Sequence, residues 1–566
     1  MVSNVKSSRV RVKETKSSNC LDRIEFWLYC HPEQHEDGER VTATSTTGQP
    51  ERPDHEVVII GAGISGIGVA IALRRTGIHD VVLFERASDI GGTWRDNTYP
   101  GVGVDVPAQG YQFSFALKPD WSRVFAKGAE VKAYVDDCAD RYDIRRLVRL
   151  NSEVTARTWD DDQSLWRLTV AGRQVSARFV ISAIGPFIEP KPPAIDGISE
   201  FEGTILHSTS WDHRVGLFGK RVAIIGTGAS AVQIIPEIVK ETAHLDVYQR
   251  TPIWVTPKID AAMPAAASAL FRTVPPLQRL VRNSAARMME TFLIGVALKH
   301  DTVATVNHST TRVLREIWYR AQVRDQEIRR KLTPDYDFGC KRPATSNTYL
   351  QTFNRHNVEL VTDPIQRITP RGVATVAGVE RDVDVIVLAT GFRTATDPEC
   401  YRRTPVRGRD GFDLATFYAE NRARSYESVS MPGLPNHFTI FGPYGWVGGT
   451  WHDLVETASN HIVRVITEFH RRGASAVEVH EGAADRWTEF ARERMSHSVW
   501  ALGNCATANS YYYDQHGDTT YIRPTSAREA WHASRTFALD DYEFRRGSRG
   551  QGADGVEHPL ASLSTR

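Results

Sequence analysis

Two glycine-rich turns in the chain have the spacing of dinucleotide-binding turns. GAGISG covers residues 61–66, and GTGASA covers residues 226–231. In such a turn the first glycine permits a tight bend, the second lets the backbone approach a pyrophosphate, and the third position lets the helix pack on the strand. Backbone amides at the start of the helix then face the phosphates. The residues expected in these roles are Gly61, Gly63 and Gly66 in the first turn and Gly226, Gly228 and Ala231 in the second.

The second strand of each unit ends on a charged residue, and the two charges have opposite sign. Glu85 and Arg250 stand at the same distance along the chain from the first glycine of their own turn. A carboxylate at this position accepts hydrogen bonds from a ribose, whereas a guanidinium suits a 2′-phosphate. We therefore expect FAD in the first unit and NADPH in the second. The alternative for Arg250 is a solvated charge at a strand end.

Both turns must be held by alternating strands and helices, so the predicted fold class is α/β with two Rossmann-like domains. A similar strand follows each unit later in the chain, which predicts that the NADPH domain is inserted in the FAD domain. The runs of strand type lie at 55–60, 81–85, 179–187, 221–226, 245–250 and 384–392.

The predicted domain boundaries follow from this insertion. They are an N-terminal extension at 1–50, FAD-binding segments at 51–196 and 386–566 (the latter with the C-terminal tail), NADPH-binding segments at 197–256 and 337–385, and a helical insertion at 257–336. Helical spacing in the insertion predicts a buried stripe that walls the substrate entrance. Its members are Leu277, Val281, Ala285, Met288 and Phe292.

Composition excludes several classes of function. The 566 residues include 69 Lys and Arg against 68 Asp and Glu, so there is no basic excess for nucleic acid. No apolar run approaches the roughly 18 residues of a membrane span. The six cysteines are dispersed without a CxxC, which predicts neither a disulfide framework nor a metal site and favours a reducing, cytoplasmic location. The basic, serine-rich residues 1–18 predict a disordered tail rather than a transit peptide, and nothing predicts the oligomeric state.

Two longer motifs resemble those of type I Baeyer–Villiger monooxygenases, which are class B flavoprotein monooxygenases. FEGTILHSTSWD (201–212) is similar to F-x-G-x-x-x-H-x-x-x-W-[P/D], and GGTWRDNTYPGVGVD (91–105) is similar to [A/G]-G-x-W-x4-[F/Y]-P-[G/M]-x3-D. The resemblance spans about residues 50–545. It implies that the first motif lies on the linker between the FAD and NADPH domains. Its histidine then helps to position one domain against the other and does not shuttle protons. The residues of this linker fingerprint are Phe201, Gly203, His207, Trp211 and Asp212.

The same resemblance implies the reaction. One oxygen atom of O2 is inserted beside the carbonyl of a small ketone, through a C4a-peroxyflavin, to give an ester or lactone. The segment GCKRP (339–343) then supplies Arg342, which stabilises the peroxide anion and the adduct, and Asp105 orients this arginine. At about 4 Å and an effective dielectric near 20, one positive charge contributes about 4 kcal/mol, or about three pK units. The alternative for Lys341 and Arg342 is a solvated basic pair.

Further cofactor contacts are implied by the matching positions. Ser65, Trp94, Tyr111 and Val154 match FAD contacts, and Asp105 also matches a position close to the flavin. Thr227 and Ser230 join the second turn at the NADPH pyrophosphate, and Lys341 and Thr251 join Arg250 at the 2′-phosphate. The match departs at Trp446 and Trp451, and at Tyr511 or Tyr512, where many relatives have a tryptophan. Two other functions remain open: an N- or S-oxygenating flavin monooxygenase, and a non-catalytic flavoprotein that binds or senses. The missing redox CxxC disfavours a disulfide reductase.

Overall fold

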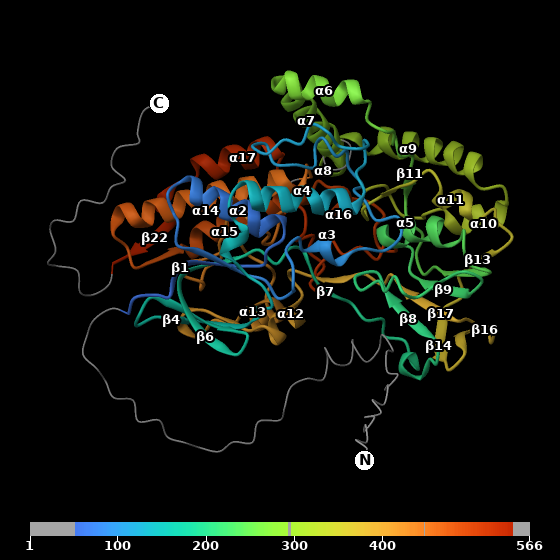
Figure 1. Cartoon of the computed structure of the whole chain (residues 1–566), viewed down its shortest axis with the longest axis horizontal. Helices are drawn as coiled ribbons and strands as arrows, with labels where there is room; N and C mark the ends of the chain where they lie inside the picture. The colour runs from blue at the N-terminus through green and yellow to red at the C-terminus, as the bar shows by residue number, and fades with distance from the viewer. Residues whose placement is uncertain (1–50, 292–295, 447, 547–566) are drawn as a thin grey trace, which may run out of the picture.

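Two α/β lobes lie side by side in the computed structural model, which describes residues 51–291, 296–446 and 448–546 (Figure 1). The predicted N-terminal extension and the last twenty residues lie outside this description. The first sheet is on the left of Figure 1, the second is on the right, and the helices of the insertion run across the top.

The first lobe is built on a mixed sheet of eight strands. Its order is β19-β4-β5-β6-β1-β2-β3, with β20 paired to the end of β6. The layer β20-β6-β1-β2-β3 is parallel, as a dinucleotide-binding sheet requires, and β4, β5 and the start of β6 form an antiparallel meander. The strands are β1 (His55–Ile60), β2 (Val81–Phe84), β3 (Val148–Arg149), β4 (Val154–Asp160), β5 (Leu165–Val170), β6 (Arg173–Ser182), β19 (Val406–Arg407) and β20 (His437–Thr439).

The second lobe has a parallel sheet of five strands in the order β13-β10-β9-β17-β8. The chain leaves this sheet after Leu388, a little later than the predicted boundary at residue 386. The strands are β8 (Thr204–His207), β9 (Arg221–Ile225), β10 (His244–Tyr248), β13 (Val358–Val361) and β17 (Val385–Leu388). A three-stranded antiparallel sheet extends this lobe: β14 (Ile365–Thr369), β15 (Gly372–Thr375) and β16 (Glu380–Asp382).

Each glycine turn joins the central strand of its sheet to a helix, as predicted. The first lies between β1 and α2 (Ile64–Arg75), and the second lies between β9 and α5 (Ala229–Ile238). Gly61 has φ +100°, and a β-carbon on Gly66 would lie 1.9 Å from the carbonyl oxygen of Gly61. The first turn therefore accepts no larger residue at its third glycine without moving the backbone.

The insertion is helical, and Leu277, Val281 and Ala285 of its predicted apolar stripe are half-buried. Within α7 (Pro275–Glu290) the buried side chains are Gln278 and Arg282, whereas Met288 is exposed. These polar groups meet partners that the sequence pattern does not reveal: Gln278 donates to the carbonyl of Lys118, and Arg282 pairs with Asp453. Phe292 lies outside the described residues. The other helices here are α6 (Ala265–Thr273), α8 (Val296–Leu298), α9 (His300–Gln322) and α10 (Gln326–Leu332).

A short parallel pair, β11 (Val255–Thr256) with β12 (Ala344–Thr345), brings the two ends of the insertion together. The backbone amide of Ala344 donates to the carbonyl of Trp254, and the indole of Trp254 donates to the carbonyl of Tyr336. Lys341 and Arg342 lie just before β12 in the sequence, so this strand pair fixes the backbone next to them.

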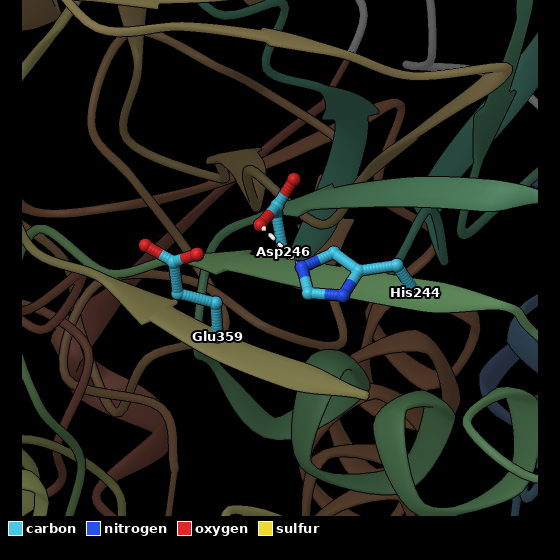
Figure 2. A group of neighbouring side chains, drawn as sticks. All are labelled: His244, Asp246 and Glu359. Carbon is cyan, nitrogen blue, oxygen red and sulfur yellow. Dashed lines mark hydrogen bonds and ion pairs between the residues drawn. The ribbon is translucent and has the colours of Figure 1, made fainter. Parts of the chain in front are cut away.

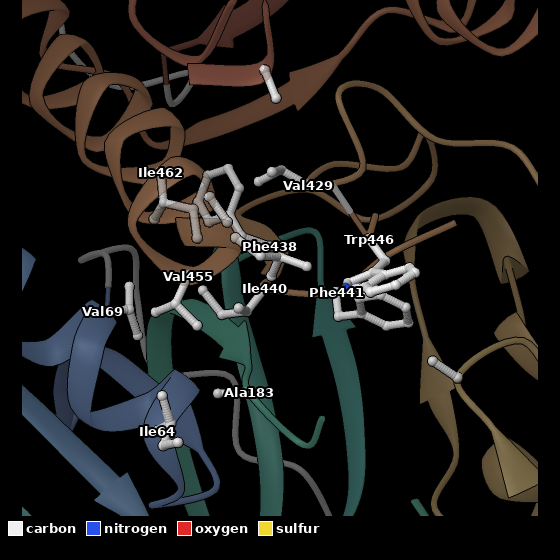
Figure 3. Close-up of a cluster of buried hydrophobic side chains, with 14 of the residues drawn as sticks. Ile64, Val69, Ala183, Val429, Phe438, Ile440, Phe441, Trp446, Val455 and Ile462 are labelled. Carbon is white, nitrogen blue, oxygen red and sulfur yellow. The ribbon is translucent and has the colours of Figure 1, made fainter. Parts of the chain in front are cut away.

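The C-terminal part of the chain returns to the first lobe. Helix α14 (Trp451–Arg472) begins with a capping box formed by Thr450 and Asp453, and it packs on α2. Figure 3 shows Val455 and Ile462 of this helix meeting Phe438 and Ile440, beside a pair of larger rings, Phe441 and Trp446.

The remaining elements are short or peripheral. They are α3 (Thr93–Asp96), α4 (Gly128–Arg141), β7 (Phe187–Pro190) with β18 (Phe392–Thr394), α11 (Tyr349–Thr352), α12 (Pro398–Arg403), α13 (Leu414–Glu420), β21 (Ala476–Val479) with β22 (Tyr542–Arg545), α15 (Glu481–Met495), α16 (Val499–Leu502), α17 (Ala527–Thr536), and the 3-10 turns Arg145–Leu147, Ile198–Glu200, Arg409–Gly411 and Leu539–Asp541. Among the described helices, none combines the length and apolar character that crossing a bilayer requires.

The cysteine prediction needs correction. Cys340 and Cys505 form a disulfide, although 165 residues separate them in the sequence. Cys138 and Cys400 are the free cysteines among the described residues, and both are buried. Spacing alone could not reveal this pair, because folding brings the segment after the helical insertion against a C-terminal segment.

Candidate functional site

One large cavity of about 2420 Å³ runs between the lobes. It exceeds the roughly 300–1,000 Å³ of a single small-molecule pocket, so it has room for two dinucleotides and a substrate. Eighteen of the predicted residues line it: Gly61, Gly63, Ser65, Glu85, Trp94, Asp105, Tyr111, Val154, His207, Asp212, Gly226, Thr227, Gly228, Ser230, Arg250, Thr251, Lys341 and Arg342.

The described stripe residues predicted to wall the substrate entrance do not line the cavity; they are Leu277, Val281, Ala285 and Met288. The other predicted residues that do not line it are Gly66, Ala231, Phe201, Gly203 and Trp211. Ala231 and Trp211 belong to the buried cluster of the second lobe, and Phe201 belongs to the core between β8 and β17. These residues pack elements against each other, so most of the fingerprint acts on the linker and not on a ligand.

Glu85 is buried at the end of β2, as the sequence predicts. Its carboxylate accepts from the amides of Ala62 and Ala87 and from the guanidinium of Arg95, at 2.9–3.0 Å. An ionised carboxylate has about four acceptor positions, so one remains for a ribose hydroxyl. The sequence pattern does not single out Arg95, although it lies inside the matched motif beside Trp94.

Aromatic side chains gather on the side of the cavity that the first glycine turn lines. The indole of Trp94 donates to the hydroxyl of Tyr111 at 3.2 Å, and the indole of Trp451 donates to the hydroxyl of Ser65 at 2.9 Å. Trp451 thus connects the first turn of α14 to the start of α2. Burial raises the pKa of Tyr111, which keeps this phenol neutral.

A cluster of cations marks the second dinucleotide turn. The hydroxyl of Thr227 donates to the carbonyl of Thr251, and Arg250 and Lys341 are close enough to affect each other electrostatically. Burial, and then the charge of Arg250, lower the pKa of Lys341 to about 8. Arg250 is exposed two residues after β10, and Lys341 is half-buried, so the pair offers positive charge to an anionic ligand in this part of the cavity.

Arg342 and Asp105 form a bidentate ion pair. The Nε and Nη2 atoms of Arg342 each donate to one carboxylate oxygen of Asp105, at 2.9 Å. Burial alone would lower the pKa of Arg342, but the carboxylate outweighs it and holds the pKa above the ordinary value. The fork geometry fixes the plane of the guanidinium, and its five donors leave N–H groups for an anion in the cavity.

Several aromatic residues lie around Arg342 in the cavity wall. The guanidinium carbon lies 5.2 Å from the ring centroid of Trp446, and Tyr511 and Tyr521 line the cavity with it. Tyr512 is buried behind Tyr511, with ring centroids 4.9 Å apart. Of the two tyrosines left open by the sequence, Tyr511 is therefore the one that faces the cavity.

His207 ends β8 and is buried. Its Nδ1 accepts from the backbone amide of Thr209 at 3.2 Å, so the ring proton is on Nε2, which has no partner among the described residues. Burial lowers the pKa of His207 to about 4. The imidazole is neutral at physiological pH, which disfavours a proton shuttle.

The segment that carries Asp105 also touches the second lobe. Gln233 of α5 accepts from the hydroxyl of Tyr99 and donates to the carbonyl of Gly103, at 3.0 Å in each case. The sequence does not point to Gln233, because its partners lie more than a hundred residues away along the chain. Through it, the helix of the second turn is coupled to the position of Asp105.

A second polar cluster lies away from the cavity, on the edge of the second sheet. His244, Asp246 and Glu359 have ligand atoms within 4.8 Å of one another (Figure 2). The guanidinium of Arg381 pairs with Glu359 and lies 3.8 Å from Asp246. Since a cation already neutralises both carboxylates, we assign no metal to this cluster.

Comparisons with known proteins agree with this geometry. Residues 58–288, which hold both glycine turns, match the family model described as pyridine nucleotide-disulphide oxidoreductase. A Baeyer-Villiger monooxygenase of Pseudomonas aeruginosa is 38% identical over 492 residues, covering 86% of this chain and 89% of the relative. One from Streptomyces coelicolor is 35% identical over 507 residues, covering 88% and 95%.

Among solved structures, the crystal structure of OTEMO in complex with FAD and NADP has a TM-score of 0.77 and 29% identity, and the match covers 87% of this chain and all of that one. The predicted family, α/β fold class and monooxygenase class are thereby confirmed, and the predicted cofactors agree with those in this complex. At this level of identity over most of both chains, the protein belongs to the Baeyer–Villiger monooxygenase family.

Proposed function

We propose that the protein uses FAD, NADPH and O2 to insert one oxygen atom beside the carbonyl of a ketone, giving an ester or lactone. The observation that carries this proposal is the bidentate Arg342–Asp105 pair in the wall of a cavity that both glycine turns also line. A dependence on NADPH also supports the predicted cytoplasmic location, where this cofactor is regenerated.

The residues fit both cofactors. The first turn offers helix-start amides beside the free acceptor position of Glu85, which suits the pyrophosphate and ribose of FAD. The second turn offers amides beside Arg250, Thr251 and Lys341, which suits the 2′-phosphate of NADPH. When bound, NADPH supplies a hydride and FAD activates dioxygen.

Arg342 holds negative charge in the substrate region. Its permanent charge favours the anionic form of the oxygen nucleophile, and its remaining N–H groups stabilise the oxyanion of the adduct with the ketone. Asp105 fixes the orientation of the guanidinium. An oxygenase that attacks nitrogen or sulfur with a neutral, electrophilic oxygen needs no such cation, so the pair favours ketone oxygenation.

The test is a panel of linear, ring and aryl ketones incubated with purified holoenzyme and NADPH, with products identified by mass. We expect an ester or lactone one oxygen heavier than the ketone. In Arg342→Ala, NADPH should still bleach the flavin, but ester should be absent and H2O2 should replace it. Arg320→Ala, at an exposed arginine of α9, is the matched control. A normal ester yield from Arg342→Ala would refute the role of Arg342.

A further inference from the structure

The disulfide lies directly beside the proposed oxygenation site. Cys340 is fully buried and immediately precedes Lys341 and Arg342. Its partner, Cys505, follows α16 at the start of a segment that we call the cavity loop, residues 503–523. Their Cα atoms are 5.2 Å apart. The bond therefore joins the short segment before β12, which carries Arg342, to the cavity loop from the C-terminal part of the chain.

The cavity loop reaches both proposed ligand regions. The side-chain amide of Asn509 donates to the hydroxyl of Thr251 at 2.8 Å, beside the cations expected to bind the 2′-phosphate. Further along, Tyr511 and Tyr521 line the cavity near Arg342. A change in the position of this loop would therefore alter the NADPH site and the surroundings of Arg342 together.

Apart from the disulfide, hydrogen bonds near the solvent connect the loop to the residues before Cys340. The amide of Asn504 donates to the carboxylate of Asp337 at 2.9 Å, the amide of Asp337 donates to the carbonyl of Asn504 at 3.1 Å, and the side chain of Asn504 donates to the carbonyl of Asp335 at 2.9 Å. One buried bond supports them, from the indole of Trp500 to the carbonyl of Gly339 at 3.0 Å. Exposed hydrogen bonds open at little cost, so the covalent bond contributes most to holding the start of the loop. The end of the loop is held separately, by backbone hydrogen bonds between Trp446 and both Tyr521 and Arg523.

We propose that the Cys340–Cys505 disulfide is a redox-sensitive positioning element, which holds Arg342 and the cavity loop in the arrangement that couples NADPH oxidation to oxygen transfer. This inference rests on the proposed function. Disulfides inside cells are mostly redox-responsive rather than permanent, which agrees with such a role.

The redox step needs a two-electron oxidant, and hydrogen peroxide is sufficient. The thiols of Cys340 and Cys505 give up two protons and two electrons, an S–S bond forms, and the O–O bond of H2O2 breaks to give two water molecules. A monooxygenase releases H2O2 whenever O2 is reduced without oxygen transfer. The reduced enzyme would thus produce the oxidant that restores its own disulfide.

The test compares the FAD-loaded wild type with Cys505→Ser and Cys340→Ser, and Cys400→Ser, at a free buried cysteine, is the matched control. Peptide mapping after alkylation should find the 340–505 cross-link in the oxidised wild type. Both variants should keep their FAD content within about two-fold. Ester formed per NADPH should fall at least three-fold, with a matching rise in H2O2, and proteolysis within 503–523 should be at least ten-fold faster. A dithiol reductant should reproduce these changes in the wild type, and H2O2 should reverse them there but not in the variants.

The absence of the cross-link in the oxidised holoenzyme would overturn the inference, and so would unchanged coupling and proteolysis in both serine variants. The peptide map and the proteolysis rates need no ketone. If no ketone yields an ester in the wild type, the proposed function fails, and these two measurements still decide whether the disulfide holds the loop.

Discussion

The guanidinium of Arg342 lies over the indole of Trp446, with 5.2 Å between the guanidinium carbon and the ring centroid, while Asp105 binds the same guanidinium in its plane. Two contacts of different kinds, an ion pair and a cation–π contact, therefore determine the orientation of Arg342. The backbone of Trp446 is held by two hydrogen bonds. Its amide donates to the carbonyl of Tyr521, and its carbonyl accepts from the amide of Arg523.

Replacing Trp446 tests the contact over the ring face. Trp446→Leu keeps an apolar side chain, although a smaller one, and loses the cation–π attraction, which contributes about 0.5–2 kcal/mol. We expect ester formed per NADPH to fall about two- to thirty-fold, while the rate of flavin reduction stays the same. Trp446→Phe keeps an aromatic face and should retain most of the coupling. Equal coupling in the two variants would show that the indole only fills space.

Replacing Asp105 tests the contact in the plane. Asp105→Ala leaves Arg342 charged but free to rotate, and a misplacement of about 1 Å can cost about 100-fold in rate. We therefore expect ester formation to fall ten- to one-hundred-fold, with FAD content close to that of the wild type. The rate of ester formation by Asp105→Asn should lie between those of the wild type and Asp105→Ala, because the amide oxygen can accept only one of the two N–H bonds. Loss of FAD from Asp105→Ala would instead assign this carboxylate to flavin binding.

The parts of this site that the sequence predicts are those with local patterns. Strand, glycine turn and helix follow one another within a short stretch, so the positions of both turns can be inferred from the amino-acid order alone. Short motifs that resemble those of a known family point to Arg342 and Asp105, and folding brings the two side chains into contact across 237 residues.

The parts that the sequence does not predict depend on partners distant along the chain. Gln233, Arg95 and the Cys340–Cys505 pair belong to no periodic pattern. In α7, helical periodicity finds the half-buried face that holds Leu277, Val281 and Ala285. It misses Gln278 and Arg282, which are buried beside them against polar groups of other segments. Periodicity detects apolar burial, and it cannot detect a buried side chain whose hydrogen bonds are satisfied elsewhere.

The depressed pKa of Lys341 predicts how nucleotide preference depends on pH. Its pKa is about 8 in the free protein, so the ammonium is charged below pH 8 and is lost as pH rises above it. We expect kcat/KM for NADPH to fall about ten-fold between pH 7 and pH 9.5, and kcat/KM for NADH, which has no 2′-phosphate, to change little. Lys341→Arg should remove the decline because a guanidinium stays charged. Parallel profiles for the two nucleotides would exclude Lys341 from the 2′-phosphate site.

Gly203 tests the packing role of the linker fingerprint. A β-carbon at this position would lie 2.5 Å from the ring of Phe201 and 2.7 Å from the carbonyl oxygen of Asp384, which precedes β17. Gly203→Ala must therefore displace either a buried ring or a strand, at a cost of about 1–3 kcal/mol. We expect thermal unfolding, followed by the fluorescence of released flavin, to occur at least about 2 °C lower than in the wild type. Gly216→Ala is the matched control, because a β-carbon there meets nothing within 4 Å. If both variants unfold at the wild-type temperature, close packing is not the reason for a glycine at position 203.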